Sequence, residues 1–91
     1  MQILILDGEK MTDILQAHAY LKRALHFPDY YGSNLDALAD CLGELGPHTH
    51  IILQNAPAMR ESLGLYADRL LGVFKECSSE PYSFHFAVDG E

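Results

Sequence analysis

Apolar residues along the chain fall into short continuous runs and into segments with helical spacing. The run at residues 2–6 is followed by Asp7 and Gly8, which is typical of a buried strand that ends in a turn. Residues 50–54 predict a second short strand, and residues 82–88 predict a third with alternating character. Because of this alternation, one face of the third strand is expected to contain Tyr82, Phe84, Phe86 and Val88.

Apolar positions three and four residues apart predict a first helix after the first strand. Thr12 or Asp13 can cap its start. Pro28 forces the residues before it out of helical conformation, so the helix is expected to end at about His26. Its apolar face is expected to contain Ile14, His18, Leu21 and Leu25, with Leu15 beside it.

A second helix is predicted from a cap at Ser33 or Asn34 to residues 43–46, before Pro47. A short helical turn over residues 58–63 and a longer helix over residues 66–77 follow the second strand. The inner face of the longer helix is expected to contain Tyr66, Leu70, Val73, Phe74 and Cys77.

This order of elements predicts an α/β fold, because strands that alternate with helices form a parallel sheet through crossovers of one hand. Three strands and about four helices indicate a small architecture of two layers. The 91 residues, 48% of them hydrophobic, can build one core. We therefore expect a single domain over residues 1–91.

The second predicted helix carries an acidic ridge formed by Asp36, Asp40 and Glu44, each four residues apart. Such residues stack along one side of a helix, where like charges repel by a few tenths of a kcal/mol per pair (roughly 0.2–0.5). The helix dipole favours Asp36 near the start but not the two acids near the end. The opposite side is an apolar stripe of Leu35, Leu38, Ala39 and Leu42. Stability alone does not explain the ridge.

The charge distribution extends this observation to a whole segment. The formal net charge is −7, and no Lys or Arg occurs between Arg23 and Arg60. This balance argues against nucleic acid or an anionic membrane as the direct partner and suits a cationic one. An acidic protein with an uneven solvated face would explain the net charge well, but it explains the ridge less well.

The N-terminal sequence lacks the features of a signal peptide, and no apolar run approaches the ~20 residues of a membrane span. We therefore expect a cytoplasmic protein in which Cys41 and Cys77 are free thiols.

The sequence gives only weak evidence for a catalytic or metal-binding site. His18 lies on an apolar helix face and is best explained as a core residue, while His48 and His50 lack a third ligand for zinc. Asp36 and Asp40 could form a carboxylate pair or hold a divalent metal, as in a small metal-dependent hydrolase. A helical ridge is convex, however, and a short chain has little left to enclose it. We expect no enzymatic activity, metal or cofactor.

A protein-binding site needs aromatic anchors beside its charge, and Tyr30 and Tyr31 supply them. We expect one ring to pack inward and Tyr30 to be the exposed one. Gly32 is expected to provide a turn position with positive φ and to let a partner approach closely.

Residues 28–42 then show a family resemblance. The run YYGSNLDAL, followed two residues later by Asp40, resembles the signature of barstar, the bacterial intracellular inhibitor of a secreted ribonuclease. The DGE after the first strand and VFKE in the late helix extend the similarity over the chain. The resemblance implies a three-stranded parallel sheet with helices, in agreement with the order predicted above.

The resemblance also implies how such a protein inhibits. In the family, the loop and second helix enter the ribonuclease active site, where the residue matching Asp40 replaces a substrate phosphate. The position of Asp36 adds negative charge, and the tyrosine matching Tyr30 packs on the catalytic histidine. The remaining implied contacts are Gly32, Asn34 and Leu35 along the interface and Glu76 in an outlying ion pair.

Some positions depart from the family pattern. Ala39 stands where many members have tryptophan, and residues 43–45 also differ. These positions, which include Gly43 and Glu44, border the implied interface, so the cognate ribonuclease is expected to differ as well. Glu44 has no counterpart in the pattern, and we hypothesise that it makes a partner-specific contact.

The sequence thus favours a ribonuclease inhibitor that binds one-to-one and is a monomer when free. The main alternative is a barstar-like module that binds another basic protein and inhibits no ribonuclease.

Overall fold

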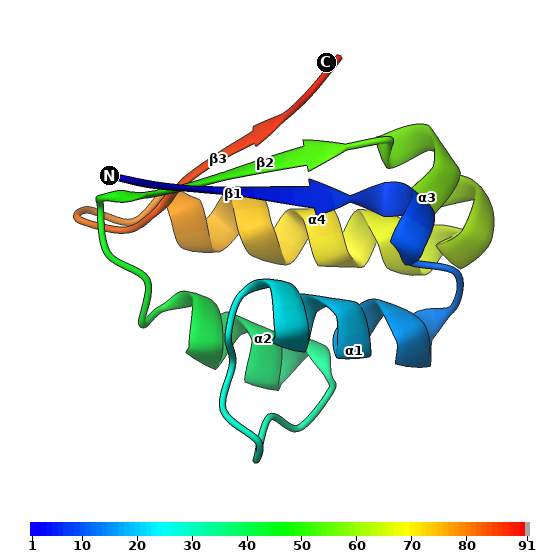
Figure 1. Cartoon of the computed structure of the whole chain (residues 1–91), viewed down its shortest axis with the longest axis horizontal. Coiled ribbons are helices and arrows are strands. Elements are labelled where there is room, and N and C mark those ends of the chain that lie inside the picture. The colour runs from blue at the N-terminus through cyan, green and yellow to red at the C-terminus, as the bar shows by residue number, and fades with distance from the viewer. Residues whose placement is uncertain (91) are drawn as a thin grey trace.

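Three parallel strands form one sheet in the computed structural model of the chain, which describes residues 1–90 (Figure 1). They are β1 (Gln2–Asp7), β2 (Thr49–Gln54) and β3 (His85–Val88). β2 lies in the centre, and its Ile51 is aligned with Leu4 of β1 and Phe86 of β3. The predicted three-stranded parallel sheet is confirmed.

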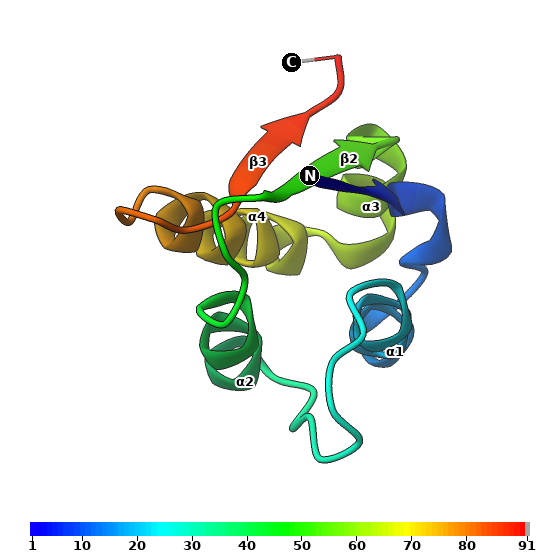
Figure 2. The same cartoon turned by 60° about the vertical axis from the view of Figure 1, so that its left-hand side comes forward.

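The helices all lie on one side of this sheet (Figures 1 and 2). The first crossover contains the short 3₁₀ helix η1 (Gly8–Lys10), α1 (Ile14–Ala24) and α2 (Leu35–Leu42). The second contains α3 (Ala56–Leu63) and α4 (Leu65–Ser78). α2 packs against α4, and the loop between α1 and α2 projects at the end of the molecule away from the sheet (Figure 2). The order of elements is the predicted one.

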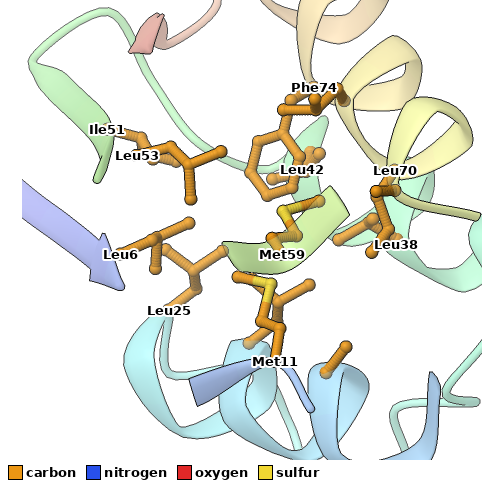
Figure 3. Packing of buried hydrophobic residues seen from close by; sticks show 14 of the residues in the cluster. Leu6, Met11, Leu25, Leu38, Leu42, Ile51, Leu53, Met59, Leu70 and Phe74 are labelled. Carbon is orange, nitrogen blue, oxygen red and sulfur yellow. The ribbon is translucent and has the colours of Figure 1, made fainter. Parts of the chain in front are cut away.

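The core lies between the sheet and the helices (Figure 3). On the inward face, Leu6, Ile51 and Leu53 are buried and Leu4 is half-buried. On the other face, Ile3 and Ile5 of β1 are 57% and 55% exposed. The continuous apolar run therefore forms a strand that is buried on one face only. The core residues labelled in Figure 3 are Leu6, Met11, Leu25, Leu38, Leu42, Ile51, Leu53, Met59, Leu70 and Phe74.

The buried face of α1 differs from the predicted one at its first turn. Asp13 caps the helix by accepting a hydrogen bond from the Gln16 amide at 2.8 Å. Ile14 and Leu15 are exposed, and Ala17 takes their place in the core. The inner face consists of Ala17, His18, Leu21 and Leu25.

Two element boundaries also differ from prediction because of left-handed backbone positions. α1 ends at Ala24, since His26 has φ +57° and cannot continue the helix. Tyr82 has φ +63° and is exposed, so it lies outside β3 and not on its inner face. Phe84 precedes the strand but is buried, in edge-to-face contact with Phe74.

Among residues 1–90, no helix combines the length and the apolar character that a membrane span requires.

Gly8 lies at a close approach between the end of β1 and the start of α3. A Cβ atom at this position would lie 2.3 Å from the carbonyl oxygen of Asn55. The Asn55 side chain donates a hydrogen bond to Asp7 at 2.8 Å, which ties the two segments together. We expect Gly8→Ala to lower the free energy of unfolding by about 1–3 kcal/mol, as overpacking does.

Urea denaturation measures this change, and Gly46→Ala is the matched control because no atom lies within 4 Å of the added Cβ. The control should change stability by less than about 0.5 kcal/mol. Equal effects of the two substitutions would contradict the proposed close approach.

Candidate partner-binding surface

The loop between α1 and α2 folds around two buried rings. Phe27 and Tyr31 are buried with their ring centroids 5.0 Å apart. The Tyr31 amide donates to the Pro28 carbonyl oxygen at 3.0 Å, which closes a turn. Tyr30, between these positions, is 87% exposed. One ring therefore packs inward and Tyr30 projects outward, as the sequence predicts.

Tyr31 is joined to the rest of the molecule through His18. The two nitrogens of this buried imidazole lie 2.6 Å from the Tyr31 hydroxyl and 2.7 Å from the Tyr66 hydroxyl. Burial lowers the pKa of His18 and raises the pKa of Tyr31. A neutral imidazole has one donor and one acceptor, so one tyrosine donates to the ring and the other accepts from it. This network links α1, the loop and α4.

Asn34 is the N-cap of α2. Its side-chain oxygen accepts a hydrogen bond from the Ala37 amide at 2.8 Å, and its nitrogen donates to the Gly32 carbonyl oxygen at 3.3 Å. The left-handed position before the cap is Ser33, with φ +53°, and not Gly32 as predicted. A Cβ at Gly32 would make contacts of 3.4 Å with Ala37 and Asn34. Neither backbone conformation nor a severe clash therefore demands glycine at position 32.

The acidic ridge is exposed along its whole length. Asp36 and Asp40 lie on α2, and Glu44 follows the helix in a last turn closed by its amide, which donates to the Cys41 carbonyl oxygen at 3.2 Å. The last turn of α2 contains no basic residue. The negative end of the helix dipole therefore adds to the two carboxylates at this end of the ridge.

The loop and the C-terminal end of α2 enclose a groove of about 520 Å³. Leu25 and Phe27, both buried, supply apolar surface, while Tyr30, Asp40 and Glu44 are exposed around it. Its lining residues are Leu25, His26, Phe27, Pro28, Tyr30, Asp40, Cys41, Glu44 and Leu45. The fold thus places the exposed tyrosine and two acids of the ridge around one concave surface.

Comparison with known proteins shows the family of this chain. The family model described as Barstar (barnase inhibitor) matches residues 1–89. The chain belongs to the barstar family. It is 43% identical over 81 residues, 88% of this chain and 89% of the relative, to a Bacillus subtilis (strain 168) protein named "Putative ribonuclease inhibitor YrdF". Both comparisons support a ribonuclease-inhibitor function, and barstar proteins are inhibitors and not enzymes.

The other positions implied by the barstar resemblance do not line the groove. Asp36 lies one helical turn before Asp40, outside the groove. Glu76 is exposed on α4, whose next residue, Cys77, approaches the Ala39 carbonyl oxygen at 4.0 Å. The remaining positions are exposed Gly32, Asn34 and Gly43, and half-buried Leu35 and Ala39.

The sequence did not predict that Leu25, His26, Phe27 and Pro28 would line the same groove as the acidic ridge. Pro28 and the end of α1 were visible as a break in the helical pattern. The pattern gives no measure of how closely this break approaches the end of α2, because that distance depends on tertiary packing.

Among residues 1–90 of this barstar chain, the other reactive groups form no catalytic or metal site. Burial raises the pKa of Cys41 and of Cys77, and the carboxylates of Asp40 and Glu44 raise that of Cys41 further. His50 stacks on His85 across the sheet with centroids 4.5 Å apart. Within residues 1–90, no three or more His, Cys, Asp or Glu side chains are grouped as metal ligands would be.

Proposed function

We propose that this barstar-family protein inhibits a ribonuclease by inserting the tyrosine loop and α2 into the enzyme's basic active-site cleft. Asp40 would occupy the place of an RNA phosphate, Asp36 would add negative charge, and Tyr30 would pack on the catalytic histidine. The observation that supports this most directly is the exposure of Tyr30 beside Asp40 and Glu44 on one groove. A tyrosine anchor next to exposed carboxylates fits an aromatic and cationic partner site.

The chemistry of the enzyme supports the same conclusion. A ribonuclease binds an anionic substrate, so its cleft concentrates positive charge, and carboxylates held in a fixed geometry compete with phosphate for that charge. In this protein the complementary segment contains no Lys or Arg from residue 24 to residue 59. Inhibition of this kind needs neither a metal nor a cofactor.

The remaining positions have supporting roles in the proposal. Neither the backbone conformation nor packing within the chain requires glycine at position 32. We therefore assign Gly32 to the interface, where the absence of a side chain lets the enzyme approach the loop closely. Leu35 and Ala39 would contribute apolar contact, and Glu76 an ion pair at the edge. Asn34 and Gly43 complete the surface at the two ends of α2.

The biological setting follows from the proposed target. A one-to-one inhibitor, monomeric when free and made of a single domain over residues 1–91, would protect the cytoplasm of the producing bacterium from its own ribonuclease. Direct binding to nucleic acid or to a membrane plays no part in this role.

Titration of the purified protein into an RNA-cleavage assay with a microbial guanyl-preferring ribonuclease tests the proposal. Cleavage should fall in proportion to added protein and stop near an equimolar ratio. If no ribonuclease of this class is inhibited, the alternative is favoured, in which the barstar-like surface binds another basic protein. Hydrolysis by this protein alone that stops on addition of chelator would contradict both.

Electrostatic steering gives a kinetic prediction. The screening length falls from about 30 Å at 0.01 M salt to about 3 Å at 1 M salt, so association should slow steeply over this range. This dependence is characteristic of charge-steered pairs, among which barstar with its ribonuclease is itself a reference case. Stopped-flow mixing with an inhibited ribonuclease measures the rate, and an association rate that does not change with salt would exclude steering.

A further inference from the structure

We infer that the groove between residues 25–30 and the end of α2 is a second subsite, which receives an arginine side chain of the ribonuclease from outside its catalytic centre. Glu44 is the residue that determines this specificity. The inference rests on the proposed function, in which the neighbouring Asp40 faces the catalytic centre. The groove lies directly beside that contact because Asp40 and Glu44 both line it.

The charge of the groove selects a cation. Two exposed carboxylates line it, and neither Lys nor Arg is among its lining residues. The α2 helix ends there without a basic residue in its last turn, so its dipole adds negative potential. Lys22, at the end of α1, lies 3.8 Å from the carboxylate of Asp29 and not in the groove. Apart from the imidazole of His26, the lining residues offer no cationic side chain, so a cation from outside the chain can neutralise this potential.

The apolar and aromatic surface of the groove selects arginine among cations. An arginine has an apolar stem that can cover Leu25, Phe27 and Leu45, and a planar head that can stack on the ring of Tyr30. The same head donates paired hydrogen bonds to carboxylates, which a lysine ammonium does not do in a fixed geometry. A volume of about 520 Å³ accommodates such a side chain together with adjoining atoms.

Glu44, and not the rest of the ridge, distinguishes this subsite. Asp36 does not line the groove, and Asp40 is assigned to the catalytic contact. Glu44 is held in place by the turn that follows α2 through its amide and the Cys41 carbonyl oxygen. Glu44 is therefore the acid of the ridge that remains for a contact inside the groove.

An NMR titration of the full chain tests the subsite without any ribonuclease. The probe is N-acetyl-arginine amide, and the matched probe is N-acetyl-citrulline amide, which has nearly the same shape and no charge. Arginine should give saturable shifts in the amide resonances of residues 25–30 and 40–45, with citrulline at least about fivefold weaker. Glu44→Gln should weaken arginine binding about two- to fivefold, as loss of one exposed ion pair does.

Two variants control for the loss of a charge. Glu61→Gln removes an exposed acid from α3, away from the groove, and should leave arginine binding unchanged. Asp36→Asn removes a charge from the same ridge and should weaken binding less than Glu44→Gln does. Equal binding of citrulline or of N-acetyl-lysine amide, or a larger loss in Asp36→Asn, would overturn the assignment.

The two proposals can fail separately. Selective binding of arginine by a protein that inhibits no ribonuclease would support the subsite and refute the proposed function. If a ribonuclease is inhibited, a double-mutant cycle should show coupling of Glu44 with one arginine outside the enzyme's catalytic centre. Inhibition in which Glu44→Gln is additive with every arginine substitution would overturn the subsite alone.

Discussion

Asp40→Ala should abolish tight inhibition of the ribonuclease and leave the chain folded. The Asp40 side chain is exposed, and no hydrogen bond or ion pair of it occurs within residues 1–90, so folding loses nothing when it is removed. Repulsion with Asp36 and Glu44 falls by a few tenths of a kcal/mol per pair (roughly 0.2–0.5), which stabilises α2 slightly. In the complex, truncation leaves the enzyme's basic groups buried without a partner.

The binding loss should be at least about 2 kcal/mol, or roughly 30-fold, a scale to which barstar itself contributed and which is therefore borrowed from the family. Inhibition titrations measure it, with urea denaturation of the same samples as a test of folding. Glu61→Ala is the matched control, because it removes one negative charge from an exposed position on α3. An unfolded Asp40→Ala variant, or a folded one that inhibits normally, would refute the role in phosphate mimicry.

The parallel sheet and the order of helices could be predicted because each depends on local patterns. Residues 50–54 are a short apolar run, and Asn34 is a strong cap that the structure uses as such. What failed depends on longer-range information. An apolar run cannot distinguish burial on one face from burial on two, hence the exposure of Ile3 and Ile5. Pairing with β2 begins at His85, so alternation alone placed Tyr82 wrongly in the strand.

The same distinction between local and longer-range information applies to the candidate site. The acidic ridge follows from spacing along one segment, and Tyr30 was the expected outward ring of an adjacent tyrosine pair; the structure agrees with both. The groove requires the ends of α1 and α2 to meet, which is decided by the packing of Phe27 and Tyr31. The left-handed position at Ser33 was missed because glycine was the more obvious candidate next to it. The assignment of contacts to individual residues stays a prediction.

Substitution of His18 should lower the stability of the fold strongly, although His18 lies outside the proposed interface. In His18→Leu, the hydroxyls of Tyr31 and Tyr66 lose their partner, and Tyr31 remains buried. An unsatisfied buried hydroxyl costs about 1–3 kcal/mol, so a loss of about 2–4 kcal/mol in the free energy of unfolding is expected. Inhibition should weaken as well, because Tyr31 holds the loop that presents Tyr30.

The buried His18 ring should also make the stability of the fold depend on pH. Burial lowers the pKa of His18 in the folded chain below its ordinary value of 6.5, so protonation favours the unfolded chain. The stability supplied by the neutral ring is complete above about pH 6.5 and is lost as the pH falls from there towards the folded-state pKa. A hydrogen bond from Asn55 lowers the pKa of Asp7 below its ordinary value of 3.8. Asp7 therefore changes the stability only near or below pH 3.8, well separated from the pH range in which His18 acts.

Urea denaturation at about pH 7.5 and about pH 5.5 measures this contribution, because the two values lie on either side of the ordinary imidazole pKa of about 6.5, which the unfolded chain retains. His18→Gln removes the titrating group, so its stability should fall less between the two pH values than that of the unmodified protein. His48→Gln is the matched control, since His48 is exposed just before β2 and should keep the full dependence. An identical dependence in all three proteins would show that His18 does not couple protonation to folding, and the Tyr31–His18–Tyr66 network would then be a packing arrangement without a pH-sensitive role.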